Sequence, residues 1–182
     1  MTPHGLTSSL ALLGRTPSVL DALLRDLPAE WISHNEGEGS WSARDVVGHL
    51  IHLERTDWMA RARRILEKGE RTPFDPVDRW GHVREIEGKA LGQLLDEFAR
   101  GRSDNLRALA ALGLRPEDLE RRGRHPSLGV VTLSHLLATW AAHDLTHLHQ
   151  ITRVLAFPYR EAVGPWERYL GVMHCTGHGA AS

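Results

Sequence analysis

The chain has 182 residues, of which 22 are basic and 23 acidic, so it is almost neutral at pH 7. This length is enough for one well-buried core. The balanced charge gives no electrostatic reason to expect a nucleic acid or an anionic membrane as a partner. The single cysteine, Cys175, excludes an internal disulfide and fits a reducing compartment. Histidine is unusually frequent, with 12 copies.

The N-terminal region lacks the basic start and the long apolar core of a signal peptide. No run of apolar residues approaches the ~18 that span a bilayer. We therefore expect a cytoplasmic protein with no nucleic acid and no membrane as partner.

The first apolar stretch extends from Leu6 to Leu27. It contains Thr16-Pro17, a pair typical of a helix N-cap and first helical position. We expect a short N-terminal turn and then a helix from about Pro17 to Leu27, which Pro28 ends.

The second apolar stretch follows a polar loop that contains glycine. Ser42 and Asp45 resemble a capping box, with aspartate in place of the usual glutamate or glutamine. They predict a helix over about residues 43–68 with one apolar face. A long loop over residues 69–81, which contains two prolines, follows it.

A third amphipathic segment covers about residues 83–112 and ends at a glycine and Pro116. The polar connection over residues 121–131 shows no strand-like alternation. Thr132 is the expected N-cap of the last long helix, which continues to about Ala156.

Four long helices predict an all-α fold, a single antiparallel bundle. We expect one domain over residues 1–173, with a short helix starting near Pro165. A mobile C-terminal tail is expected over residues 174–182.

Two histidines of the last helix, His143 and His147, lie four residues apart within its apolar face. Residues i and i+4 share one face of a helix, so both rings can bind the same metal ion. His149 points elsewhere and is expected to be exposed. Asp144 is expected at the edge of the apolar face.

The second helix carries further inward-facing histidines. His49 and His52 both fit the inward face, and Gly48 favours His49 because a missing side chain allows a helix or ligand to approach closely. Three neutral imidazoles bind ions such as Zn²⁺, Ni²⁺ or Fe²⁺ and leave open positions for chemistry. The spacing is equally compatible with three core histidines that hydrogen-bond to their neighbours.

Imidazoles that bind a metal usually donate their other N–H to an acceptor. Asp45, one turn before His49, and Gln150, three residues after His147, are candidate acceptors. Trp140, one turn before the histidine pair, is a candidate wall of a ligand pocket, although ordinary core packing explains it as well.

Two other groups of residues are candidate functional sites. A basic loop could bind an anionic group of a substrate, and a C-terminal motif could bind a metal, although a mobile tail explains the latter better. The loop residues are Arg121, Arg122, Arg124 and His125, and the tail residues are His174, Cys175 and His178.

Two motifs resemble the DinB-like (YfiT-type) metalloenzyme family. Residues 41–50, WSARDVVGHL, resemble its W-S-x-x-(E/D)-x-x-x-H-L stretch, and residues 143–151, HDLTHLHQI, resemble its H-D-x-x-H-x-x-Q-I stretch. Residues 164–170 also resemble the closing region of one branch of the family. The resemblance covers about residues 16–170.

The resemblance implies a four-helix bundle with up-down-down-up connectivity. It also implies one divalent metal ion, nickel or zinc first and manganese or iron next, bound by His49, His143 and His147. This ligand set selects His49 over His52.

The same resemblance implies a metal-dependent enzyme that acts on a small molecule. It is either an S-transferase that uses a low-molecular-weight thiol or a hydrolase that activates water. The competing interpretation is a non-catalytic protein, in which the metal braces the bundle or the pocket senses a ligand. Dimers are frequent among similar proteins, so a homodimer is expected, with Trp166 and Tyr169 as candidate contacts.

Overall fold

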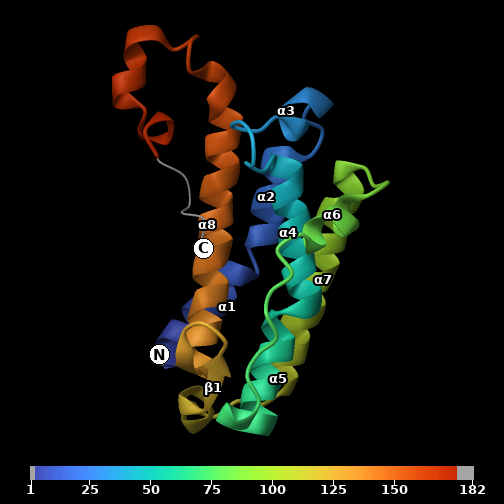
Figure 1. The fold of residues 1–182 in the computed structure, drawn as a ribbon, viewed down its shortest axis with the longest axis vertical. Coiled ribbons are helices and arrows are strands. Elements are labelled where there is room, and N and C mark those ends of the chain that lie inside the picture. The colour runs from blue at the N-terminus through green and yellow to red at the C-terminus, as the bar shows by residue number, and fades with distance from the viewer. Residues whose placement is uncertain (1–2, 176–182) are drawn as a thin grey trace.

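A computed structural model of the chain describes residues 3–175, and four long helical segments form its body (Figure 1). These segments are α1 (Pro3–Leu13) with α2 (Thr16–Leu24), α4 (Ala43–Thr56) with α5 (Trp58–Lys68), α7 (Leu91–Ala111), and α8 (Leu133–Ala156). The shorter elements are α3 (Ala29–Ser33), α6 (Gly81–Ile86), β1 (Arg122–His125), β2 (Gly129–Thr132) and the 3₁₀ turns η1 (Gly69–Arg71), η2 (Pro116–Glu120), η3 (Phe157–Tyr159), η4 (Gly164–Tyr169) and η5 (Gly171–Met173).

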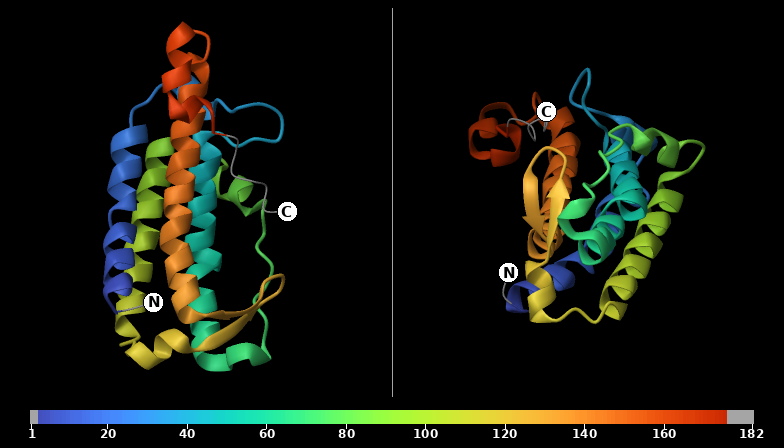
Figure 2. Two further views of the ribbon diagram at one scale, coloured as in Figure 1. Left: turned by 90° about the vertical axis from the view of Figure 1, so that its left-hand side faces the viewer. Right: turned by 60° about the horizontal axis from the view of Figure 1, so that its bottom comes forward.

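The four segments run up, down, down and up along the long axis (Figures 1 and 2). The two consecutive descending segments, α4–α5 and α7, require the chain to return along the bundle, and residues 72–80 make this return. The predicted all-α four-helix bundle and its up-down-down-up connectivity are confirmed.

Two predicted helix starts are confirmed at the level of hydrogen bonds. Ser42 and Asp45 form a reciprocal capping box: the Ser42 N–H donates to Asp45 Oδ2 over 2.9 Å, and the Asp45 N–H donates to Ser42 Oγ over 3.2 Å. Thr132 Oγ1 accepts the N–H of His135 over 3.1 Å at the start of α8. Both N-caps satisfy N–H groups that the first helical turn leaves without partners.

Several predicted elements differ from the structure. The N-terminal turn is a helix, α1, and Thr16 begins α2 without capping it. The helix predicted over residues 43–68 is interrupted at Asp57. The segment predicted over residues 83–112 divides into α6 and α7, because Gly88 adopts a φ of 67° between them.

The connection over residues 121–131, predicted without strands, forms the antiparallel hairpin β1–β2. Its residues lack strong alternation, and contacts with α5 explain why they are extended. A Cβ built on Gly123 would lie 2.7 Å from Ile65 Cγ1, so the hairpin backbone packs directly on the helix.

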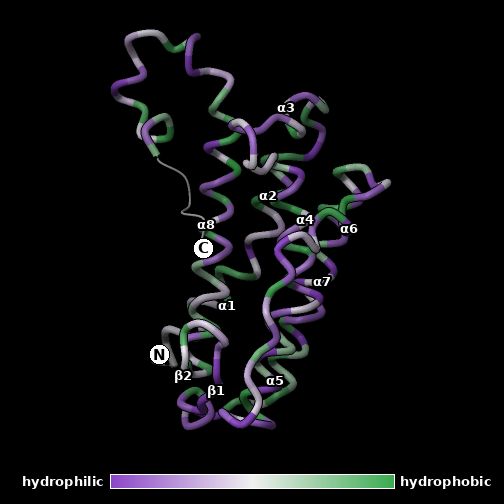
Figure 3. Tube along the Cα trace, in the orientation of Figure 1, coloured by the Kyte–Doolittle hydropathy of each residue, from purple (hydrophilic) through white to green (hydrophobic). Residues whose placement is uncertain are grey.

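Hydrophobic and hydrophilic positions alternate along the long helices (Figure 3), as expected for helices that bury one face. The buried apolar residues form two clusters. On α8, the last buried member of the first cluster is Ala141 and the buried member of the second is Ile151. The histidine pair of α8 therefore lies between the two apolar clusters. No helix within residues 3–175 combines the length and apolarity needed to cross a membrane.

Candidate metal centre

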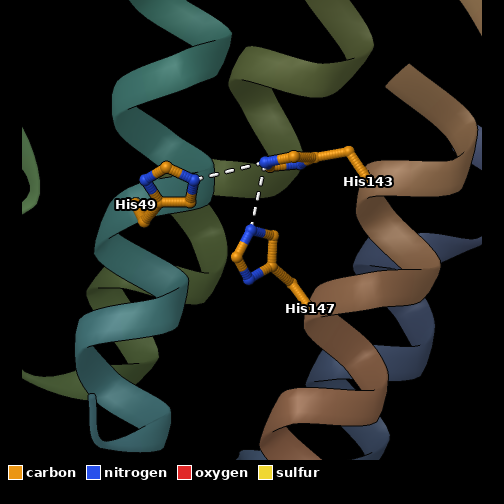
Figure 4. Close-up of side chains that lie close together, drawn as sticks. All are labelled: His49, His143 and His147. Carbon is orange, nitrogen blue, oxygen red and sulfur yellow. Dashed lines mark hydrogen bonds between the residues drawn. The ribbon is translucent and has the colours of Figure 1, made fainter. Parts of the chain in front are cut away.

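His49 of α4 and the pair His143 and His147 of α8 converge between the helices (Figure 4). The Nε2 atom of His143 lies 3.3 Å from Nε2 of His49 and 3.0 Å from Nε2 of His147. The candidate ligand atoms of all three lie within 4.8 Å of one another. Nitrogens that share one zinc ion at its usual bond length are about 3.0–3.4 Å apart. The separations of 3.3 Å and 3.0 Å therefore fit a shared divalent ion.

Burial keeps two of these rings in the neutral form that binds metals. Desolvation, reinforced by neighbouring histidines, lowers the pKa of His49 to about 3 and that of His143 to about 2. Both rings are therefore uncharged at pH 7, with a nitrogen lone pair free to bind a cation.

The third ring is oriented by an amide. Nδ1 of His147 lies 2.8 Å from Oε1 of Gln150. The carbonyl oxygen can only accept, so Nδ1 donates and the lone pair of Nε2 faces the other rings. The contact predicted for Gln150 is therefore present.

The contact predicted for Asp45 is absent, because its carboxylate accepts hydrogen bonds from the Ser42 backbone N–H and hydroxyl. The Nδ1 atoms of His49 and His143 are buried and have no hydrogen-bond partner within residues 3–175. These two rings are held by packing instead of by an oriented acceptor.

Two tryptophans flank the histidines. The ring of Trp41 is centred 4.9 Å from that of His49, and Trp58 meets His143 edge-on at 5.2 Å. Trp140, the predicted wall, lies behind Trp58, stacked on it at 5.6 Å, and is almost fully buried. The sequence thus predicted Trp140, which stacks on Trp58, the tryptophan that meets His143. It did not predict Trp41, although Trp41 begins the first motif.

His52 lies outside the group. Its ring turns toward α6, where Nδ1 is 3.6 Å from Glu85 Oε1. A Cβ built on Gly48 would lie 2.4 Å from Ile86 Cγ2, so the space beside His49 is filled by α6 and not by a ligand. The geometry favours His49 as the histidine of α4 that faces the pair.

Asp144 was predicted at the edge of the apolar face and is instead fully buried. Its carboxylate accepts hydrogen bonds from the guanidinium of Arg102 and from the hydroxyl of Thr16. The sequence offered no signal for Arg102, because a lone arginine within an amphipathic helix usually faces solvent.

The other candidate residues are engaged elsewhere. In the basic loop, Arg122 pairs with Glu70 at 3.0 Å and Arg121 donates to the Leu66 carbonyl at 2.6 Å, at the end of the bundle where β1 lies (Figure 1). Nε2 of His174 lies 2.9 Å from the carbonyl oxygen of Glu167. His178 lies outside the described residues. Among residues 3–175, the three convergent histidines are the one group of three or more His, Cys, Asp or Glu side chains that could hold a metal ion.

Residues 12–151 match the model of the DinB superfamily, and this range includes both motifs. The chain belongs to the DinB superfamily. Its structure is similar to that of YfiT from Bacillus subtilis, with a TM-score of 0.73 and 19% sequence identity over 86% of this chain and 88% of that one. YfiT is described as a probable metal-dependent hydrolase with an unusual four-helix bundle topology. At this identity the similarity shows that the two share a fold. No curated protein matches the sequence closely enough to count as a relative.

Proposed function

We propose that this DinB protein is a metal-dependent enzyme that acts on a small molecule, with one divalent ion held by His49, His143 and His147. The observation that carries the proposal is the convergence of three imidazole nitrogens from two helices. Catalytic zinc sites use three protein ligands and keep a position for water or substrate. Zinc and nickel are the first candidates, and manganese and iron come next.

A divalent ion in such a site lowers the pKa of a coordinated water or thiol, which suits hydrolysis or S-transfer. The residues of the chain orient and enclose this chemistry. Gln150 fixes the tautomer of His147, and the rings of Trp41 and Trp58 offer apolar surface next to the histidines. The description of YfiT favours hydrolysis, and transfer to a low-molecular-weight thiol is the second candidate reaction.

The test compares the wild type with His143→Ala and with His149→Ala, which removes an exposed histidine of the same helix. Each protein is loaded with zinc or nickel and assayed against esters, amides and pairs of a thiol with an electrophile. We expect turnover by the wild type and His149→Ala and none by His143→Ala. Metal retention without turnover on any substrate would instead favour a protein in which the metal braces the bundle or the pocket senses a ligand. The cytoplasmic location and the homodimer stay predictions.

A further inference from the structure

A buried ion cluster lies at the centre of the bundle. The guanidinium of Arg102 on α7 pairs with Glu54 of α4 over 2.8 Å and with Asp144 of α8 over 2.5 Å. The three side chains are 1%, 2% and 0% exposed, respectively. Ions removed from water to this extent interact strongly with one another and with any further charge nearby.

The surrounding hydrogen bonds indicate that both carboxyl groups are ionised. Oε1 of Glu54 accepts from Arg102 and from Trp140 Nε1, and Oε2 accepts from Asn105. Each oxygen of Asp144 accepts from the guanidinium. Partners of Glu54 that are all donors leave no acceptor for a carboxylic acid proton. Burial works to lower the pKa of Arg102, but its bonds and charge interactions with the two carboxylates raise it.

The cluster therefore holds one positive and two negative charges, a net charge of −1. Neutralising the charge of a buried arginine requires one carboxylate. The second carboxylate is a negative charge in excess of what the arginine neutralises, and its desolvation opposes folding. A further cation near the cluster would balance it.

The cluster is connected to the convergent histidines along the helices and through two indole rings. Asp144 follows His143 directly, and Glu54 is five residues after His49, about 7.5 Å along α4. The stacked rings of Trp140 and Trp58 connect Glu54 to His143. The positive charge of Arg102 reaches His143 and opposes a cation on that ring, so the two carboxylates have to outweigh it.

We propose that Glu54 and Asp144, held by Arg102, form a buried counter-charge that stabilises the divalent ion bound by the three histidines. The inference rests on the proposed function, because it concerns the same metal ion. Three neutral imidazoles leave the full charge of such an ion uncompensated, and a net negative charge behind them attracts it. Buried charges are screened little by salt. Arg79 exerts an opposing positive charge on His49, but its side chain is exposed and its field is weakened by water. These are electrostatic positioning residues and not catalytic ones.

The test separates charge from architecture with two matched pairs of variants. Glu54→Gln and Asp144→Asn each remove one negative charge and keep the size of the side chain. Asn105→Ala and Thr16→Val each remove a neutral hydrogen-bond donor to the same two carboxylates, over 2.9 Å and 2.6 Å in the structure. Two quantities are measured for each: the Kd for Zn²⁺ by competition with a chromophoric chelator, and the urea midpoint of the metal-free protein.

The charge-removing variants should bind zinc about tenfold or more weakly than the wild type. The neutral variants should lower the urea midpoint and leave the zinc Kd unchanged. Zinc binding by either charge-removing variant equal to that of the wild type would overturn the inference. Equal weakening of zinc binding by the neutral variants would also overturn the inference. The same holds if neither charge-removing variant folds, with or without zinc, because each result gives the cluster a structural role alone. A wild type that binds no zinc would instead refute the proposed function itself.

Discussion

Gln150 holds the ring of His147 from one turn further along α8, with 2.8 Å between Oε1 and Nδ1. Of the three convergent histidines, His147 has an oriented acceptor at its second nitrogen. Nδ1 of His49 and Nδ1 of His143 have no hydrogen-bond partner in the described part of the chain. The orientation of one ring therefore depends on a single amide, and this dependence can be tested.

Replacing Gln150 with alanine should weaken zinc binding about tenfold, because the ring of His147 then loses the acceptor that fixes its tautomer. A chelator competition titration measures the change. Gln150→Glu keeps an acceptor at the same distance from the backbone and should bind zinc at least as tightly as the wild type. Unchanged affinity in Gln150→Ala would show that packing alone orients the ring.

His52→Ala should keep the metal and lose stability. His52 is buried but turns toward Glu85 and Gly81 instead of toward the other histidines. We expect a decrease of about 1–3 kcal/mol in the free energy of unfolding, the usual range for a buried side chain. Urea unfolding and metal analysis distinguish a structural residue from a metal ligand. His49→Ala is the matched variant, which should lose the metal. Loss of metal in His52→Ala would refute the assignment of His49.

The metal-free protein should lose stability as the pH falls below about 6.5. The pKa values of His49 and His143 fall from the ordinary histidine value of 6.5 to about 3 and about 2 on folding, because burial disfavours the charged rings. Between these limits the unfolded chain binds two protons that the folded chain does not, so stability rises with pH and falls as pH is lowered. The slope from two such groups approaches about 2–3 kcal/mol per pH unit.

Urea unfolding of the metal-free protein at several pH values measures this slope. His143→Gln removes one of the two titrating rings and should show a clearly shallower dependence on pH between 6 and 4 (about half the contribution of the two rings). Identical slopes in the two proteins would mean that the rings are not held neutral by burial.

Gly48→Ala should destabilise the bundle, because the added Cβ would lie 2.4 Å from Ile86 Cγ2 and 3.1 Å from the backbone oxygen of His82. Overpacking of this kind lowers stability by about 1–3 kcal/mol. Gly101→Ala in α7 is the control: its Cβ would meet Glu54 Cβ at an ordinary 3.6 Å, and the higher helix propensity of alanine should raise stability by about 0.5–1 kcal/mol. Thermal unfolding of both variants measures whether stability falls or rises relative to the wild type. A Gly48→Ala variant as stable as the wild type would contradict the close packing of α4 on α6.

Residues close together in the sequence predicted the helix starts and the helix faces correctly. The capping box at Ser42 and the N-cap at Thr132 predicted the starts of α4 and α8, because side chains within three positions satisfy the free N–H groups. Periodicity placed His143 and His147 on one face. The family resemblance supplied His49 and the connectivity of the bundle.

Features that depend on contacts distant in sequence were not predictable in this way. Thr16 reads as an N-cap in the sequence, but its hydroxyl donates to Asp144, which lies 128 residues away. The hairpin β1–β2 depends on its contact with α5, and the ion cluster depends on Arg102 meeting two carboxylates from other helices. In each case a tertiary contact outweighs the local preference.

Metal content tests the central claim most directly. Elemental mass spectrometry is applied to tag-free wild type, His143→Ala and His149→Ala, purified side by side and also reconstituted with zinc, nickel, manganese and iron(II). We predict one divalent ion per chain in the wild type and in His149→Ala, and its loss in a folded His143→Ala. A wild type that binds none of the four metals would contradict the account and return His49, His143 and His147 to the role of core histidines.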